Sequence, residues 1–123
     1  MWADALAMCR AYLIERPELG LTEATCGTHV PNPRPPVFVR LIDSGRDRRT
    51  IVHRDSRVTV EAWNDGGEGA AKLDAEALYA ALDEWALVPD WDGWPSGPYA
   101  QPDPESGAPR YVMTCLIRHR MEN

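Results

Sequence analysis

Residues 101–118 read Gln-Pro-Asp-Pro-Glu-Ser-Gly-Ala-Pro-Arg-Tyr-Val-Met-Thr-Cys-Leu-Ile-Arg, a proline-rich turn that leads directly into a strand pattern. Pro102, Pro104 and Pro109 fix their own φ angles and supply no backbone N–H, which excludes a helix or a central strand from the turn. Gly107 is free to adopt a positive φ and to reverse the chain. We therefore expect a rigid surface loop, which is more typical of assembly than of chemistry.

Three strands account for most of the remaining apolar alternation. Residues 110–119 alternate Tyr, Met, Cys and Ile against Val, Thr and Leu, and residues 37–42 are apolar and β-branched. The next strand is expected over about 50–63, after a polar hairpin loop at 43–49. Asp and Ser at 55–56 interrupt its apolar pattern, and we interpret them as a bulge.

Two segments have helical spacing. Residues 2–16 place apolar side chains at helical intervals and stop before Pro17, which cannot continue the helix. Residues 70–86 carry an apolar stripe widened by alanines. Because helices and runs of strands follow one another in this order, we predict an α+β fold with a mainly antiparallel sheet and two helices packed on one face.

The segments between these elements are shorter and more irregular. Residues 24–30 look like a short strand, and the Pro-rich run 31–36 is expected to be extended and polyproline-like. A Gly-rich turn is predicted at 64–69. Residues 88–95 are expected to form a loop or a short irregular strand, and Tyr99 to begin another edge element.

Length and composition limit the class of protein. The chain has 123 residues, of which 44% are hydrophobic and 26% charged, so we expect one globular domain over residues 1–123. No stretch approaches the roughly 20 apolar residues of a membrane span, and no secretory signal is visible, so we expect synthesis in the cytoplasm and no membrane partner. The net charge of −6 argues against wrapping a nucleic acid, although an acidic channel could let DNA slide through.

The residues give little sign of catalysis or of a metal site. Cys9 and Cys115 lie in apolar patterns and are expected in the core. Cys26 and His29 form half of a zinc-binding spacing with no second half. On one strand their side chains would point to opposite faces, which makes them a poor nucleophile–base pair. We therefore predict no catalytic, cofactor or metal site, and no enzyme.

Arginines are concentrated near the first hairpin, at positions 46, 48, 49, 54 and 57. They fit either a solvated hairpin tip or a docking prong, because guanidinium groups bind carboxylates of a neighbouring subunit through forked hydrogen bonds.

Aromatic and acidic side chains near the loops allow further interpretations. Trp91 and Trp94 are candidate core residues or interface anchors, and Trp63 is also considered for both roles but is expected to pack under the helices. Three loop carboxylates fit a solvated role better than a hard-cation site: Asp90, Asp92 and Asp103.

The ordered set of blocks at 37–40, 55–63 and 102–111, together with the N-terminal helix and the Gly-Arg-Asp-Arg-Arg hairpin, is informative as a whole. It resembles the tail terminator proteins of long-tailed, non-contractile bacteriophages. The resemblance extends over residues 2–120, although no single block is as specific as a nucleotide or metal motif.

The resemblance implies a small α+β fold and a structural role in the virion. Six copies of such a protein form a ring on the head-proximal end of the tail tube, which stops the tube from growing and offers a surface for head–tail joining. The partners implied are other copies of the chain, the tail tube protein and the head–tail connector proteins, with DNA passing through the lumen without specific binding. The residues that we predict at subunit or partner interfaces are Arg46, Arg48, Arg49, Asp103, Pro104, Pro109 and Arg110.

Other classes remain open at this stage. Another head–tail connector, tail-completion or minor tail protein is the nearest alternative, because several are of similar size. A small hydrolase or ligand-binding domain would require Cys26, His29 and an acid to converge in a pocket. A plain dimeric domain would stop at two subunits.

Overall fold

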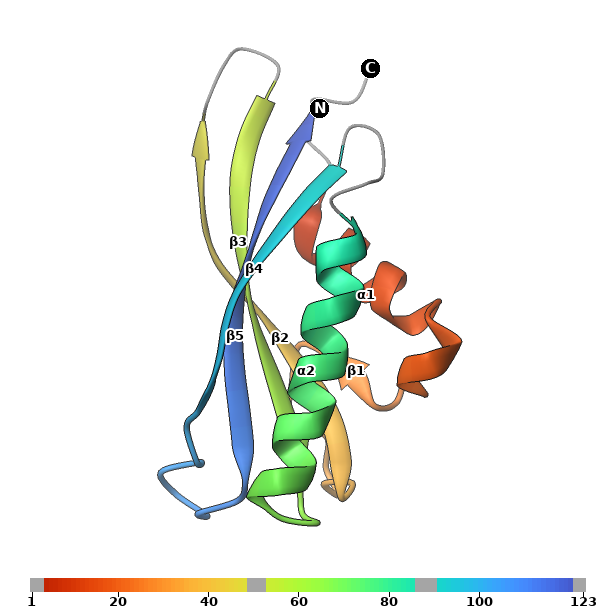
Figure 1. Cartoon of the computed structure of the whole chain (residues 1–123), viewed down its shortest axis with the longest axis vertical. Helices are drawn as coiled ribbons and strands as arrows, with labels where there is room; N and C mark the ends of the chain where they lie inside the picture. Colours follow the sequence, from red (N-terminus) through yellow and green to blue (C-terminus); the bar gives the residue numbers. More distant parts are fainter. Residues whose placement is uncertain (1–3, 49–52, 86–90, 121–123) are drawn as a thin grey trace.

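The computed structural model describes residues 4–48, 53–85 and 91–120. In these residues, two α-helices and five strands follow one another, with one short 3₁₀ turn (Figure 1). In chain order the elements are α1 (Ala5–Ile14), η1 (Pro17–Leu19), β1 (Cys26–Gly27), β2 (Val37–Arg48), β3 (His53–Asn64), α2 (Glu68–Trp85), β4 (Trp91–Ala100) and β5 (Arg110–Arg120).

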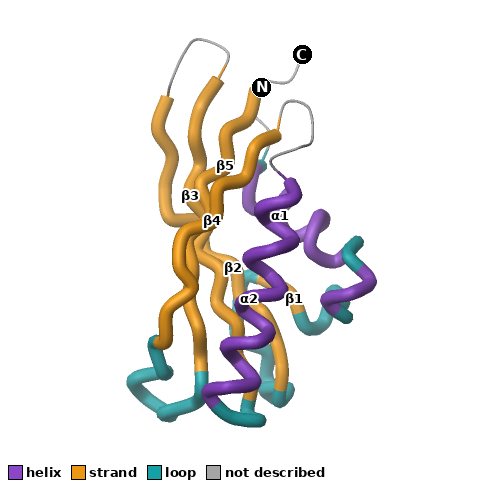
Figure 2. Tube along the Cα trace, in the orientation of Figure 1, coloured by secondary structure: helices purple, strands orange, loops and turns teal. Residues whose placement is uncertain are grey.

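The five strands form one sheet in the order β1-β2-β3-β5-β4. β1 pairs with β2 in parallel, and the other three pairs of neighbouring strands are antiparallel. Both helices lie on the same side of this twisted sheet (Figures 1 and 2). The predicted α+β class, with two helices on one face of a mainly antiparallel sheet, is confirmed.

The core lies between the helices and one face of the sheet. Alternate residues of the central strands point toward the helices, among them Val60 and Met113, which are fully buried. Leu13 of α1 and Leu82 of α2 are also fully buried and meet this face. Burying each such side chain contributes about 1.5–3 kcal/mol. The two cysteines that were predicted in the core, Cys9 and Cys115, are both there.

The helix boundaries follow local chemistry. Asp4 caps α1, because its carboxylate accepts a hydrogen bond from the N–H of Ala7 at 3.1 Å. α1 ends at Ile14, before Pro17 as predicted, and Pro17 begins the short helix η1. None of the helices in the described part of the chain is long and apolar enough to cross a membrane.

The first hairpin differs from the prediction. The polar segment expected to be a loop at 43–49 is strand as far as Arg48, because a hairpin arm in solvent does not need apolar alternation. The bulge expected at 55–56 is also wrong, since both residues are regularly paired. The irregularity lies on β2 between Asp43 and Gly45, where Gly45 has a φ of 111°.

Two further strand predictions need correction. The strand expected over 24–30 shrinks to the two residues of β1. Of the two alternatives for residues 88–95, a loop or a short irregular strand, the strand is found from Trp91 onward, and the edge element expected to begin at Tyr99 is the end of this same strand, β4, which continues through Pro95 and Pro98 to Ala100. An edge strand tolerates prolines because its outer side needs no N–H donors. Residues 88–90 lie outside the described part of the chain.

Candidate interface surfaces

In the part of the chain that the structure describes, no helix covers the face of the sheet that is turned away from α1 and α2 (Figure 1). Strand alternation determines which side chains lie there, because Val58, Val60 and Ala62 of β3 point to the helices and the residues between them point outward. We call this surface the open face and define it by Arg40, Ile42, Asp55, Arg57, Thr59, Glu61, Trp63, Thr114, Leu116 and Arg118.

A buried carboxylate interacts with several side chains at the end of the open face that is lower in the orientation of Figure 1. The side chain of Glu61 is 7% exposed and lies 3.2 Å from a guanidinium nitrogen of Arg110 and 3.7 Å from one of Arg40. The indole N–H of Trp63 donates to the same carboxylate at 3.2 Å. Two guanidinium groups therefore share one negative charge, and the local balance is positive.

Trp63 lies at the centre of a small second cluster. Its ring stacks on Phe38 with centroids 5.0 Å apart, and Ala108 completes the cluster. The guanidinium groups of Arg34 and Arg110 lie 5.7 Å and 5.1 Å from the ring centroid, within cation–π range. The expectation that Trp63 packs under the helices is wrong, because its position in the strand alternation places it on the open face.

The C-terminal loop, residues 101–109, is held by its own hydrogen bonds. A carboxylate oxygen of Asp103 accepts hydrogen bonds from the N–H and the hydroxyl of Ser106, at 3.0 and 2.6 Å, and these bonds lower the pKa of Asp103. The N–H of Gly107 donates to the carbonyl of Asp103 at 2.7 Å, and Gly107 has a φ of 72°. The predicted positive φ at Gly107 is confirmed.

This loop closes against the open face. The N–H of Gln101 donates to the carbonyl of Arg110 at 2.9 Å, and Nε of Arg110 donates to the carbonyl of Gln101 at 2.8 Å. A groove of about 520 Å³ lies beside the loop, and it is lined by Val30, Arg34, Arg40, Trp63, Asp103, Glu105, Ser106 and Arg110. Of the predicted interface residues, Asp103 and Arg110 meet at this groove, while Pro104 is exposed and Pro109 half-buried.

The arginines of the first hairpin lie at the opposite, upper end of the sheet. Arg46 forms an ion pair with Asp43, and Arg57 forms one with Asp47; all four side chains are 43% exposed or more. Arg48 is described only by its backbone, and Arg49 lies outside the described residues. The predicted interface residues therefore do not form one patch but divide between the two ends of the sheet.

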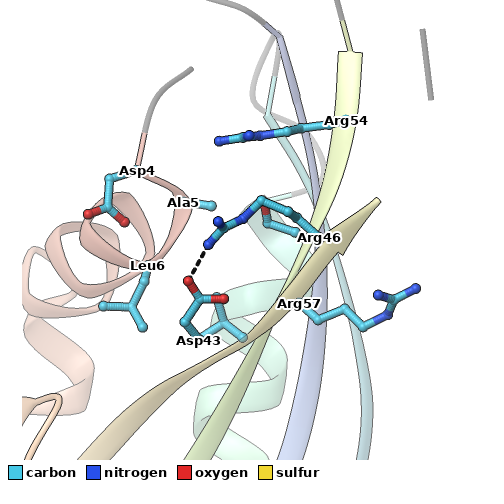
Figure 3. A pocket seen from close by; sticks show the side chains of 9 residues that line it. Asp4, Ala5, Leu6, Asp43, Arg46, Arg54 and Arg57 are labelled. Atoms are coloured by element: carbon cyan, nitrogen blue, oxygen red, sulfur yellow. Dashed lines mark hydrogen bonds and ion pairs between the residues drawn. The ribbon is translucent and has the colours of Figure 1, made fainter. Parts of the chain in front are cut away.

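A polar pocket of about 260 Å³ separates this hairpin from the start of α1 (Figure 3). Arg46 and Arg54 both point toward the helix, whereas Arg57 points to the other side of the strands. Burial lowers the pKa of Arg54, and the neighbouring charge of Arg46 lowers it further.

A buried histidine beside this pocket was not identified from the sequence. His119 is fully buried, and its Nε2 lies 2.9 Å from the hydroxyl of Ser56. Burial is the main cause that lowers its pKa, and the charge of Arg54 adds to it, so the neutral imidazole is favoured. Its only signal in the sequence is its position at the end of an alternating apolar strand.

The pair considered for catalysis does not form. The thiol of Cys26 is buried, and burial raises its pKa to about 11, so it is a poor nucleophile. His29 is exposed, and its Nδ1 lies 3.1 Å from the hydroxyl of Thr28. Within the described residues, no group of three or more His, Cys, Asp or Glu side chains is placed to hold a metal. Asp90 and the side chain of Asp92 lie outside the described part of the chain.

Comparisons with known proteins find a similar fold among solved structures. No family model matches the chain, and no curated protein is similar to it. Among solved structures, the chain is similar to a component of the virion of a native gene transfer agent particle, with 18% sequence identity and a TM-score of 0.64. The match covers 98% of this chain and 100% of the other, so the whole fold is shared with a virion component.

Proposed function

We propose that this chain is a structural virion protein whose copies form a ring on the head-proximal end of a phage tail tube. The observation that carries the proposal is the likeness in fold, over the full length of both chains, to a component of a virion particle. The sequence resemblance to tail terminator proteins supports the same role and supplies the ring of six copies.

The distribution of the predicted interface residues supports a ring with two unlike faces. Arg46 and Arg48 lie on the hairpin at one end of the sheet, whereas Asp103, Pro104 and Arg110 lie at the other. In a ring whose strands run along the ring axis, all hairpins gather on one face and all C-terminal loops on the other. One face binds the last ring of the tube and the other receives the head connector, so the tube's own addition surface is covered.

The physical properties of these two ends fit such contacts. The C-terminal loop is already ordered by its internal hydrogen bonds, so docking it costs little conformational entropy. The exposed arginines of the hairpin can exchange their local carboxylates for those of a partner. The net charge of −6 fits a lumen through which DNA moves without specific binding, and no step of this role requires catalysis.

The decisive experiment is electron microscopy of particles from a phage whose copy of this gene carries a nonsense mutation. Overlong, irregular tails that lie free of filled heads are the expected result. Tails of normal length that fail to join heads would assign the protein to the connector side instead. Ordinary infectious virions would contradict a role in the virion.

The two ends can be tested separately. An Arg48→Glu and Arg49→Glu double variant should weaken assembly, because it reverses the charge of the hairpin; unaltered ring formation would remove the hairpin from the interface. A Pro104→Ala and Pro109→Ala double variant should reduce tail joining by loosening the loop, with little change in the Tm of the isolated chain. A large loss of stability would show that the loop is structural instead.

A further inference from the structure

The two layers of the molecule carry opposite charge balances. Residues 4–26 and 67–85, which contain both helices, hold nine acidic and three basic side chains. Residues 27–66 and 91–120, which contain most of the sheet and its loops, hold eight acidic and ten basic side chains. A chain with a net charge of −6 therefore has a strongly acidic helix layer and a slightly basic sheet layer.

On the open face, the charge that reaches solvent is more positive than the residue count indicates, because the carboxylates there are buried. Its two central carboxylates, Asp55 and Glu61, are only 6% and 5% exposed. The arginines that cover them reach solvent, because the side chains of Arg40 and Arg118 are 34% and 32% exposed. A partner approaching this face therefore meets guanidinium groups first.

A weakly polar strip lies between these arginines. It consists of four half-buried side chains on three neighbouring strands, namely Ile42, Thr59, Thr114 and Leu116. A surface of this kind fits a helix face on which apolar side chains alternate with negative charges.

The outward face of α2 has that pattern. Leu73 is 70% exposed, the largest exposure among the large apolar side chains in the described residues. Glu76, Ala80 and Asp83 are exposed on the same side of the helix, at the spacing of successive turns. Neither Glu76 nor Asp83 has an ion-pair partner among the residues that the structure describes. The small side chain of Ala80 allows a flat surface to approach closely.

We propose that the outward face of α2 of one copy binds the open face of the next copy. This inference rests on the proposed ring and assigns its subunit interface. The contact is head-to-tail, because each copy offers one acidic helix face and one basic sheet face, and such contacts close into a ring by rotation. The neighbour's helix completes a second covering layer on the sheet, on the face opposite its own helices.

The interface can be tested on the full chain by sedimentation. A Glu76→Arg and Asp83→Arg double variant should lower the association constant by about tenfold or more, because it places like charges against the arginines of the open face. The matched control is Glu15→Arg with Glu23→Arg, which makes the same charge change at exposed positions next to α1 and should assemble like the original chain. Raising the salt concentration should weaken assembly of the original chain.

A crosslinking experiment covers the case in which charge reversal disturbs the fold. A chain with both Ala80→Cys and Thr114→Cys should give a ladder of disulfide-linked oligomers on oxidation, because the three native cysteines are buried. Chains with only one of the two changes should stay uncrosslinked.

Several results would overturn this assignment. The first is a ring that still forms when the charges of α2 are reversed. The second is crosslinking by Ala80→Cys alone, which would indicate a symmetric contact between helices. The third is an original chain that stays monomeric at every soluble concentration. Each would leave the capping role standing if the nonsense mutant still produces overlong tails. Normal tails from that mutant combined with α2-dependent rings would instead retain the interface and remove the capping role.

Discussion

Both ends of the sheet carry ion pairs between an arginine and a carboxylate, but the pair of Glu61 with Arg110 at one end and the pair of Asp47 with Arg57 at the other differ in burial. At the lower end, the side chains of Glu61 and Arg110 are 7% and 10% exposed, and their ion pair is buried against Trp63. At the upper end, the side chains of Arg57 and Asp47 are 43% and 60% exposed. The sequence shows arginines and carboxylates at both ends, and only burial distinguishes them.

Burial determines how much each ion pair contributes to the stability of the fold. An exposed ion pair contributes about 0–1 kcal/mol, because water and salt screen it. A buried pair is costly to break, since removing one partner leaves an uncompensated charge in a buried site. The lower end is therefore a fixed structural network, while the exposed ion pairs of the hairpin at the upper end, Arg46–Asp43 and Arg57–Asp47, are charges that a partner can use at little cost to the fold.

The largest expected effect comes from removing the shared carboxylate. Glu61→Gln keeps an acceptor for the indole of Trp63 but leaves Arg110 without its negative partner, so the free energy of unfolding should fall by about 3 kcal/mol. Chemical denaturation measures this. Glu105→Gln, a control at an exposed position in the same groove, should change stability by less than about 0.5 kcal/mol. Equal effects of the two variants would refute the distinction between buried and exposed charge at this end.

A smaller effect is expected from the backbone of the C-terminal loop. Gly107 has a φ of 72°, and no atom lies within 4 Å of the position of an added Cβ, so Gly107→Ala introduces backbone strain without a clash. The expected loss is about 1–2 kcal/mol, measured as a decrease in Tm. Gly69→Ala is the matched control, because this helical glycine also has open space around it and should stabilise α2 by about 0.5–1 kcal/mol. A neutral Gly107→Ala would show that the loop relaxes.

The upper end should respond to pH through its buried histidine. Because burial and the charge of Arg54 lower the pKa of His119, with Asp55 opposing and Arg46 adding to this, the unfolded chain binds the proton more tightly than the folded chain. The stability that depends on neutral His119 is present above the unfolded value of about 6.5 and is lost as the pH falls through the folded pKa.

Urea unfolding between pH 7 and pH 5 tests this pH dependence. Stability should decline with falling pH, and His119→Gln should make the decline shallower, whereas a change at the exposed His29 to Gln should leave the slope as it is. An unchanged slope in the His119 variant would mean that other groups cause the decline.

The smallest effect on the fold is expected at the exposed hairpin. Asp47→Asn removes the partner of Arg57 and should change the free energy of unfolding by less than about 0.5 kcal/mol, because both side chains are solvated. If the hairpin docks onto a carboxylate of a partner, this variant frees Arg57 and should leave assembly intact or strengthen it. A stability loss comparable to that of Glu61→Gln would remove the contrast between the two ends.

Local chemistry made several elements predictable. The alternation of β5, the apolar stripes of both helices and the turn at Gly107 depend on neighbours in the chain, and each was predicted within a few residues. The length of β2 and the extent of β4 were not. Polar hairpin arms and proline-containing edge strands are stabilised by pairing with β3 and β5, which lie far away in the sequence.

The candidate surfaces show the same limit. The sequence identified Arg110, Asp103 and the arginine-rich hairpin as interface candidates, but it did not show that the loop and the hairpin lie at opposite ends of the sheet. Glu61 and His119 were not singled out, because nothing in their immediate sequence marks a carboxylate or an imidazole as buried.

By itself, the sequence determined the fold class, the rigid C-terminal turn and the absence of a convincing catalytic motif. These follow from backbone restrictions and periodicity, which act over a few residues. Only the tertiary structure decided that Trp63 faces away from the helices, that Glu61 holds two guanidinium groups, and that the acidic and basic surfaces lie on opposite layers. Burial and the placement of charge depend on which distant segments pack together.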